Sequence, residues 1–360
     1  MKILFWVPYP EEGASNRIRI NQYLPYLKRD NIKYSVSSFW NDSAFRCLYK
    51  KGSYFKKICF FMFGTLRRIL DLATCWKYDL IFIHREAYPI GGLFFERSLS
   101  LFGKPYIFDF DDAIFIPSSS HSNSFIERFK NSKRIKKIIN MSSCVICGNR
   151  YLADYALKYN RNVYTIPTSI DTQKYTPEGR KEKSQDVVIG WIGSTTTLYF
   201  LNMLDNVFLG LFKHYGSNLK LKIVGGEYSL KGLGSVMSKP WRMGEEIDDL
   251  QGFDIGIMPM PDNEWTRGKC AFKAILYMSM GIPCVCSPVG VNKEIIDDGI
   301  TGFLAQDENE WIKKLSFLIE NPGLRERVGL EGSKRVERDY SVKFNAERFL
   351  EVINETHKGK

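Results

Sequence analysis

The stretch from Asp254 to Gly302 constrains the fold of this chain more than any other part of the sequence. It begins with an apolar run, Asp254–Met260, that ends at prolines, as a buried parallel strand does at its carboxyl end. A segment with helical periodicity, Phe272–Met280, follows a polar loop and is stopped by Gly281, since glycine readily takes the left-handed cap conformation. A short apolar strand, Cys284–Cys286, comes next. This order predicts an α/β domain built on a parallel sheet.

Three cationic residues follow the first of these strands. Arg267 and Lys269 lie in the loop, and Lys273 lies at the start of the helix. In an open parallel sheet, ligands bind beyond the carboxyl ends of the strands, where helix amino termini favour anions. The pattern therefore indicates a diphosphate site. A solvated basic loop on an ordinary α/β domain is the alternative, and these residues alone do not separate the two.

The same stretch resembles the nucleotide-sugar site of the retaining glycosyltransferase family 4, whose members have the GT-B fold. The resemblance is specific over the second half of the chain and weak over the first. It implies an α/β protein with two Rossmann-like domains facing each other across a cleft. The residues that match the family frame, in chain order, are Leu276, Tyr277, Met278, Ser279, Gly281, Pro283, Val285, Pro288, Gly290, Glu294, Ile295, Asp298, Gly299, Gly302, Phe303 and Leu304.

The chain departs from that family at two positions. The family usually carries two glutamates, seven residues apart, that flank the loop and the helix. The corresponding residues here are Gly268 and Leu276, and a leucine cannot accept hydrogen bonds from a nucleotide ribose. Either the donor is held by other contacts, or the chain binds a nucleotide or a partner without turnover.

The domain boundary is expected in the polar run 176–186, which is rich in residues that favour turns. Residues 1–170 are expected to form an amino-terminal Rossmann-like acceptor domain. A carboxyl-terminal helix, about 341–360, is expected to complete it. Residues 185–340 are expected to form the Rossmann-like domain that binds the nucleotide sugar.

The first half offers candidate site residues at strand ends. His84 follows an apolar strand, Leu80–His84, and the resemblance implies a histidine near this point that contacts the donor sugar. Asp109, Asp111 and Asp112 follow a strand expected at 103–108, and these carboxylates would repel each other unless they meet a cation, an acceptor hydroxyl or arginines. We interpret His84, Asp111 and Asp112 as the catalytic candidates, with the aspartates binding the acceptor or accepting its proton. Helix capping is the structural alternative for the aspartates.

Further donor contacts are predicted on both halves. Gly13 follows the first strand, Lys2–Val7, and could let the backbone approach a ligand. Arg17 and Arg19 are expected at the start of a helix over 16–28, where a cation opposes the helix dipole, and this unfavourable place suggests phosphate or acceptor contacts. The second-half residues expected at the donor are Gly193, Ser194 and Thr195 beside the diphosphate, and Trp241 and Glu294 beside the base and ribose.

No cofactor other than the donor is expected. GT-B enzymes generally stabilise the diphosphate with helix dipoles and basic residues, so the resemblance implies no metal at the aspartates. Cys144 and Cys147 form a CxxC without a second ligand pair, and we interpret them as packed strand residues.

The charge of the chain is uneven. Its net charge is +11, and residues 1–180 hold 28 Lys and Arg against 15 Asp and Glu. The segment 46–70 carries seven basic residues, several aromatic residues and no acidic one, which is typical of an interfacial helix on anionic lipid; an ordinary helix packed on the sheet is the alternative. A basic helix expected at 125–140 is a second candidate for a membrane face. No nucleic-acid motif accompanies the charge, so nucleic acid is not an expected partner.

No apolar run is long enough to span a bilayer, and the first ten residues do not form a signal peptide. A cytoplasmic protein is expected, with the anionic inner face of the cell membrane as a candidate surface. The predicted function is retaining transfer of a sugar from a nucleotide diphosphate donor to a hydroxyl of a glycan or lipid-linked acceptor, in surface polysaccharide or glycolipid assembly. A degenerate GT-B protein that binds without turnover is the main alternative. An epimerase or a phosphorylase is another, although the sequence offers no pyridoxal lysine site.

Overall fold

The computed structural model describes residues 1–48, 52–116, 134–179, 186–232 and 236–359. The chain divides into two compact units. The amino-terminal unit consists of Met1–Ser169, Gly268–Cys270 and Asn345–Lys360, and the carboxyl-terminal unit of Ile170–Arg267 and Ala271–Phe344. The change of unit after Ser169 precedes the polar run in which the boundary was expected.

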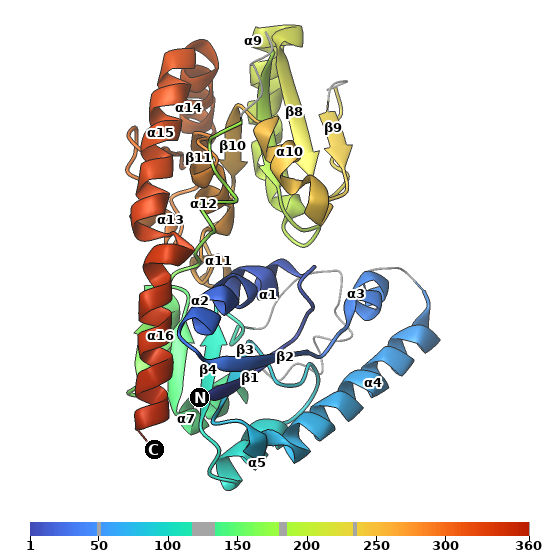
Figure 1. Cartoon of the computed structure of the whole chain (residues 1–360). Coiled ribbons are helices and arrows are strands. Elements are labelled where there is room, and N and C mark those ends of the chain that lie inside the picture. The colour runs from blue at the N-terminus through green and yellow to red at the C-terminus, as the bar shows by residue number, and fades with distance from the viewer. Residues whose placement is uncertain (49–51, 117–133, 180–185, 233–235, 360) are drawn as a thin grey trace. The chain divides into compact units, whose positions relative to one another are not determined.

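The amino-terminal unit contains a six-stranded sheet in which every pairing is parallel (Figure 1). Its order is β2-β1-β3-β4-β5-β6, so the chain reverses its direction of travel across the sheet between β1 and β3. Ligand crevices of open α/β sheets lie at such a switch point, at the carboxyl ends of the strands. The strands are β1 (Lys2–Val7), β2 (Lys33–Ser38), β3 (Leu80–His84), β4 (Tyr106–Phe110), β5 (Cys144–Cys147) and β6 (Val163–Thr165).

Helices follow these strands as in a doubly wound fold. The last helix packs on the sheet through Phe349, whose ring stacks on Tyr23 with centroids 4.5 Å apart and lies 5.6 Å from the ring of Phe82. The helices of this unit are α1 (Ala14–Arg19), η1 (Asn21–Tyr23), α2 (Leu24–Arg29), α3 (Asp42–Leu48), α4 (Tyr54–Ala73), η2 (Cys75–Lys77), α5 (Phe94–Leu101), α7 (Arg134–Met141), α8 (Arg150–Ala156) and α16 (Val342–Lys358), the last from Asn345 onward.

Two predicted elements of this unit differ from the structure, and a third lies mostly outside the described residues. The single helix expected at 16–28 begins at Ala14 and is broken into α1, η1 and α2, with a proline in the first turn of α2. The strand expected at 103–108 is β4, which extends to Phe110 and so contains Asp109. Most of the helix expected at 125–140 lies outside the described residues, and its end is α7.

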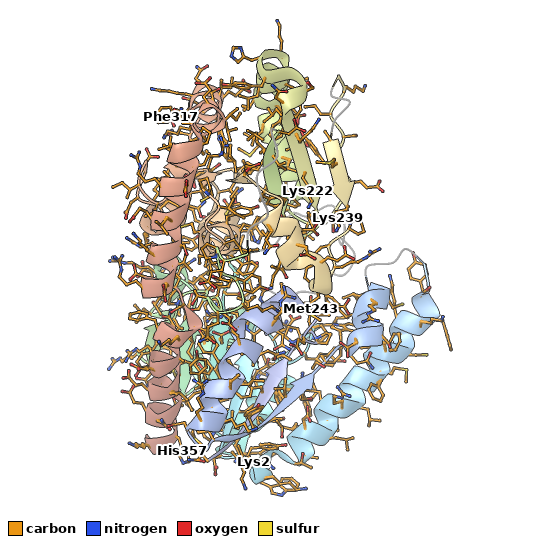
Figure 2. The ribbon with its side chains drawn as sticks, turned by 45° about the horizontal axis from the view of Figure 1, so that its top comes forward. Lys2, Lys222, Lys239, Met243, Phe317 and His357 are labelled. Atoms are coloured by element: carbon orange, nitrogen blue, oxygen red, sulfur yellow. The ribbon has the colours of Figure 1, made fainter. Side chains whose placement is uncertain are left out.

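The carboxyl-terminal unit contains a second six-stranded parallel sheet, of order β12-β11-β10-β7-β8-β9, with its switch point between β7 and β10. At its far edge Lys222 on β8 and Lys239 on β9 (Figure 2) both pair with Asp249, at 2.8 and 3.0 Å. The strands are β7 (Val187–Ile192), β8 (Leu219–Val224), β9 (Val236–Lys239), β10 (Ile255–Met258), β11 (Cys284–Cys286) and β12 (Phe303–Leu304). The helices are η3 (Leu198–Leu204), α9 (Asp205–Tyr215), η4 (Gly216–Asn218), η5 (Met243–Glu245), α10 (Glu246–Gln251), α11 (Glu264–Arg267), α12 (Phe272–Ser279), α13 (Asn292–Ile295), α14 (Glu308–Glu320) and α15 (Pro322–Asp339).

Helix α12 forms the centre of this unit's core. Every residue from Ala274 to Ser279 is buried, because the helix lies on the sheet with apolar residues all round. The helix ends where expected: Gly281 has φ +64°, and the N–H of Ile282 donates to the carbonyl of Tyr277 at 2.9 Å. This left-handed glycine cap confirms the stop signal read from the sequence.

Candidate functional site

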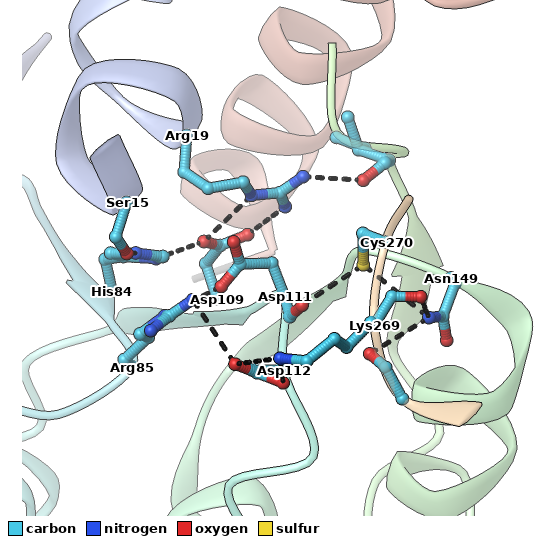
Figure 3. A network of polar contacts seen from close by, with 12 residues as sticks. Ser15, Arg19, His84, Arg85, Asp109, Asp111, Asp112, Asn149, Lys269 and Cys270 are labelled. Atoms are coloured by element: carbon cyan, nitrogen blue, oxygen red, sulfur yellow. Dashed lines mark hydrogen bonds and ion pairs between the residues drawn. The ribbon is translucent and has the colours of Figure 1, made fainter. Parts of the chain in front are cut away.

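A polar network lies at the switch point of the amino-terminal sheet (Figure 3). It is assembled from the first turn of α1, which follows β1, and from the carboxyl ends of β3 and β4. Its first member is Ser15, whose Oγ lies 2.5 Å from Nε2 of His84. Nδ1 of His84 lies 2.6 Å from Oδ2 of Asp109, and His84 is completely buried. A serine, a histidine and an aspartate thus form one hydrogen-bonded chain.

Arg19 holds Asp109, the last member of this hydrogen-bonded series. Its guanidinium pairs with both carboxylate oxygens of Asp109 and donates to the carbonyl of Ile166 at 2.8 Å. Burial alone would raise the pKa of the Asp109 carboxyl, but the charge of Arg19 and the hydrogen bonds from His84 and Arg19 outweigh it and hold the pKa below its usual range. An ionised carboxylate only accepts hydrogen bonds, so Nδ1 of His84 donates to Asp109. In the neutral imidazole, Nε2 then accepts from the hydroxyl of Ser15.

Arg19 itself was expected at a helix start with ligand contacts. That placement is wrong, because α1 begins at Ala14 and both Arg17 and Arg19 lie in its last turn, where a cation is favourable. Both arginines are buried, and Arg19 forms an ion pair with Asp109. Gly13 is the residue before α1, and a Cβ there would lie 2.7 Å from Cβ of Tyr9. Glycine at position 13 is therefore required by local packing.

A second ion-pair chain continues from β4. Nε of Arg85 pairs with Asp111 at 2.7 Å, its Nη2 lies 3.9 Å from Asp112, and Nζ of Lys269 pairs with Asp112 at 3.3 Å. Burial would raise the pKa of Asp111, but the charges of Arg85 and Arg19 and the hydrogen bond from Arg85 lower it well below its usual range. Each of the three aspartates is therefore paired with a cation, which was one of the ways in which their mutual repulsion was expected to be relieved. Ionised and paired, Asp111 is a weak proton acceptor at neutral pH.

Arg85 also carries backbone strain. Its φ is +61°, a left-handed conformation that costs a non-glycine residue of order 1 kcal/mol or more and recurs at functional sites. The N–H of Arg85 donates to the carbonyl of Asp109 at 2.7 Å, which holds the backbone in this turn. The strain turns the side chain of Arg85 onto the aspartates directly after the buried strand β3.

Residues 268–270 form part of this network because Asn149 holds their backbone. Nδ2 of Asn149 donates to the carbonyls of Gly268 and Lys269 at 3.1 and 3.0 Å, while its Oδ1 caps α8. A Cβ at Gly268 would lie 2.5 Å from Cβ of Ala113, and one at Gly148 would lie 2.4 Å from Sγ of Cys270. The position of the first family glutamate is thus filled by a glycine that packing demands.

In the carboxyl-terminal unit, a second cluster lies at the β7/β10 switch point. Nζ of Lys273, in the first turn of α12, lies 3.5 Å from Oγ1 of Thr197 and 5.3 Å from the ring centroid of Trp191. A Cβ at Gly193 would lie 2.6 Å from Cε of Lys273, so the lysine stem lies against the loop after β7. The loop is a turn in which the N–H of Thr197 donates to the carbonyl of Ser194 at 3.0 Å.

Tyr277 sets the place of Lys273, one helical turn earlier. Its hydroxyl accepts from the N–H of Ile192 at 3.1 Å and donates to the carbonyl of Ile257 at 3.3 Å, so it joins α12 to β7 and β10. A Cβ at Gly256 would lie 2.5 Å from the ring of Tyr277, so glycine in β10 makes room for it. The sequence marks Tyr277 only as a match to the family frame.

The other predicted donor residues of this unit have the following surroundings. Arg267 ends α11 and pairs with exposed Asp262 at 2.6 Å. Trp241 packs against the core, and Glu294 is exposed on α13. Ser194 and Thr195 are exposed on the loop after β7, beside the Lys273 cluster. Of the other cations predicted at the diphosphate, Lys269 pairs with Asp112 in the amino-terminal unit, and Lys273 contacts the loop after β7 in the carboxyl-terminal unit.

Sequence reasoning missed Ser15, Arg85 and Asn149 as members of the site, and missed the pairing of Arg19 with Asp109. Only the position of Arg85 after a buried strand gave a signal. Cys144 and Cys147 are both buried in β5, in keeping with their interpretation as packed strand residues. In the described ranges, no three His, Cys, Asp or Glu side chains are grouped so that they could hold a metal ion.

Comparison with known proteins adds two findings. The chain superimposes along its whole length on a glycosyltransferase from Rickettsia africae, with a TM-score of 0.72, 14% identity and coverage of 100% of this chain and 99% of the other. It also superimposes on sucrose-phosphate synthase from Thermosynechococcus elongatus (TM-score 0.70, 12% identity, 100% of both chains) and on Anabaena HepE in complex with UDP and glucose (0.67, 14%, 99% and 100%). The two doubly wound sheets and these likenesses define a protein of the GT-B fold, which confirms the predicted fold class.

The match to a family model lies in the carboxyl-terminal unit. Residues 187–321 match the family described as glycosyl transferases group 1. Trehalose synthase from Pyrococcus horikoshii is 34% identical over 134 residues, which are 37% of this chain and 31% of that protein. Trehalose synthase from Thermococcus litoralis is 33% identical over 72 residues, or 20% and 18% of the two chains. The matched regions thus span less than a third of these relatives' lengths.

Proposed function

We propose that this protein transfers a sugar from a nucleotide diphosphate sugar to a hydroxyl of an acceptor, with retention at the anomeric carbon. The group 1 domain supports sugar transfer, and the likeness to HepE, a protein seen with UDP and with UDP-glucose, supports a nucleotide donor. A glycan or lipid-linked acceptor in surface polysaccharide or glycolipid assembly is part of the proposal. A metal is not required in it.

The observation that carries the proposal is the position of Lys273 against the loop after β7, at the switch point of the second sheet. An ammonium group, the amino terminus of an eight-residue helix and the backbone of a turn converge there. Such a set stabilises the negative charge that builds up on a departing nucleotide diphosphate. Preorganised charge of this kind contributes on the order of several kcal/mol to catalysis.

In this proposal the amino-terminal network acts on the sugar and the acceptor. His84 is buried behind Ser15, so a sugar hydroxyl would bind to the Ser15 hydroxyl or displace it from Nε2 of His84. Asp109 and Arg19 position the imidazole. Because Asp111 and Asp112 are engaged by Arg85 and Lys269, they suit acceptor binding better than proton abstraction. The departing phosphate would then take the acceptor proton during attack from the same face.

The alternative of binding without turnover is motivated by Gly268 and Leu276. Gly268 has no room for a side chain against Ala113, and Leu276 is 1% exposed in the core. Neither position supplies the carboxylate that the family usually places there. A thermal shift with nucleotide diphosphates, combined with no transfer from any donor, would support this alternative.

The test is a donor panel assayed by release of nucleotide diphosphate and by the anomeric configuration of the product, with acceptors that include simple sugars and lipid-linked sugars. Lys273→Gln is expected to lower kcat/KM by roughly 100-fold, as loss of one preorganised charge does. Lys313→Gln, an exposed lysine on α14, is the matched control and should leave kcat/KM unchanged. If Lys273→Gln and the control transfer equally well, Lys273 does not stabilise the leaving group.

A further inference from the structure

Helix α4 buries a charged side chain and exposes most of its large apolar ones, which reverses the usual pattern of an amphipathic helix. Gly64, Arg68 and Leu72, spaced by four residues, form its buried line. A Cβ at Gly64 would lie 2.7 Å from the carbonyl oxygen of Phe39, and Arg68 donates to the carbonyl of Ala87 at 2.9 Å. Arg68 also pairs with Asp71 at 3.1 Å. These contacts fix the rotation of the helix about its axis, with a charged side chain on the inner face.

The outer face of α4 is apolar and aromatic. Its large hydrophobic side chains are 47% to 79% exposed, and they recur along the whole helix. Isolated apolar side chains on a surface are ordinary, but a contiguous set on one helix face marks an interaction surface. We call this set the α4 face; its members are Tyr54, Phe55, Ile58, Met62, Phe63, Leu66, Ile69 and Leu70.

The α4 face continues into a cavity of about 240 Å³ that Ile69 and the neighbouring helix α5 share. Helices α4 and α5 are in contact (Figure 1), and Phe94 of α5 is itself 65% exposed. The cavity is mostly apolar and could accept a hydrocarbon chain. Its lining residues are Thr65, Ile69, Tyr88, Ile90, Gly92, Phe94 and Phe95.

The charge around the α4 face is of one sign. The sequence has no Asp or Glu between Asp42 and Asp71, whereas Lys56 is exposed and Lys57 and Arg67 are partly exposed on α4. A second copy of the chain would bring the same lysines against each other in a two-fold pair, which disfavours that occupant. Nucleic acid would satisfy the lysines but not the apolar side chains. A surface that offers both negative charge and hydrocarbon satisfies both features.

We infer that the α4 face docks on an anionic lipid bilayer, with α4 lying in the interface, its apolar side chains among the acyl chains and its lysines at the headgroups. The α5 cavity would then receive part of a lipid tail. At 20 residues α4 is roughly 30 Å long, so it lies on the bilayer and does not need to cross it. In the described parts of the chain, no helix is both long and apolar enough to cross a membrane. This inference does not rest on the proposed sugar transfer, because docking needs no donor.

The test measures cosedimentation of the full chain with vesicles of phosphatidylcholine, alone or with 30% phosphatidylglycerol, at low and at high salt. Wild type is expected to bind the anionic vesicles at least roughly 10-fold more tightly than the neutral ones, and more weakly as salt rises. The combined variant Phe55→Gln, Ile58→Gln, Met62→Gln and Leu66→Gln is expected to lose on the order of 100-fold in affinity. Glutamine is a good helix former and all four sites are exposed, so α4 should persist.

A matched control removes four exposed apolar side chains from the carboxyl-terminal unit: Met243→Gln, Phe317→Gln, Leu330→Gln and Phe344→Gln. Two of these side chains, Met243 and Phe317, are labelled in Figure 2. The control should bind vesicles as wild type does. The pair Lys56→Gln and Lys57→Gln should weaken binding to anionic vesicles roughly 30-fold and reduce the salt dependence, at about fivefold for each charge near the surface.

The inference is overturned if wild type fails to bind anionic vesicles at low salt, or if the α4 variant binds them as tightly as its control. It is also overturned if sedimentation velocity finds a dimer that the α4 variant converts to a monomer while vesicle binding stays unchanged. Circular dichroism of each variant verifies that the helices are intact. Transfer to a soluble acceptor, measured separately, should be equal in wild type and the α4 variant, so failure of docking is distinguished from failure of the enzyme.

Discussion

The buried pair between Arg19 and Asp109 offers the sharpest test of the amino-terminal network. The two side chains are 3% and 1% exposed. Asp109→Asn removes the paired negative charge and leaves the buried guanidinium of Arg19 with the carbonyl of Ile166 and an amide as hydrogen-bond partners, and with the charge of Asp111 nearby. Breaking one side of a buried ion pair costs about 3–5 kcal/mol, because the remaining charge is uncompensated.

That loss is large against the total stability of a domain, about 5–15 kcal/mol. If the free energy of unfolding falls by about 4 kcal/mol per molar guanidinium chloride, this loss would lower the unfolding midpoint by about 1 M. Circular dichroism would measure the midpoint. Arg19→Met should destabilise by a similar amount. The double variant Arg19→Met with Asp109→Asn should lose less than the sum of the two single losses, by about 2 kcal/mol or more, because neither partner of the pair is left as an unpaired charge.

The matched control is an exposed ion pair of similar length. Lys334 and Glu331 lie 2.8 Å apart on α15 with side chains 60% and 41% exposed, so Lys334→Met should cost less than about 1 kcal/mol. If Asp109→Asn also costs under about 1 kcal/mol, or if the two core substitutions add without coupling, the reasoning about this pair is refuted.

Three further predictions concern packing and pH. Tyr277→Phe should cost about 1–3 kcal/mol in the free energy of unfolding, because the buried N–H of Ile192 loses its acceptor; equal urea midpoints for variant and wild type would contradict this. Gly268→Ala should cost about 1–3 kcal/mol, because its Cβ would lie 2.5 Å from Ala113, whereas Gly244→Ala, with no atom within 4 Å, should not reproduce that loss in a thermal melt. The lowered pKa of Asp111 contributes stability that is present above its unfolded value of about 3.9 and is lost as pH falls through the folded value, so Asp111→Asn should flatten the acid limb of a pH series of urea midpoints. An acid limb equal to that of wild type would refute this assignment.

Several elements could be read from the sequence with their bounds intact. The strands Lys2–Val7, Leu80–His84 and Val187–Ile192 are continuous apolar runs, as strands buried on both faces are. The strand around Asp109 was placed too early, because a charged residue inside a strand interrupts the apolar pattern, and only the Arg19 partner makes its burial tolerable. The α4 segment was expected as an interfacial helix from its charge, and the structure adds which side chains are exposed.

What the sequence determined by itself is local: apolar runs fix the strands, Gly281 fixes the end of α12, and the ordered motif from Leu276 to Leu304 indicates the GT-B fold. What only the tertiary structure decided is which polar side chains meet. Ser15 and His84 are 69 positions apart in the chain, and Arg19 and Asp109 are 90 apart, yet the order of the parallel strands brings their ends to one switch point. Periodicity reports burial but not partners, because a hydrogen bond between distant strands leaves no regular spacing in the sequence.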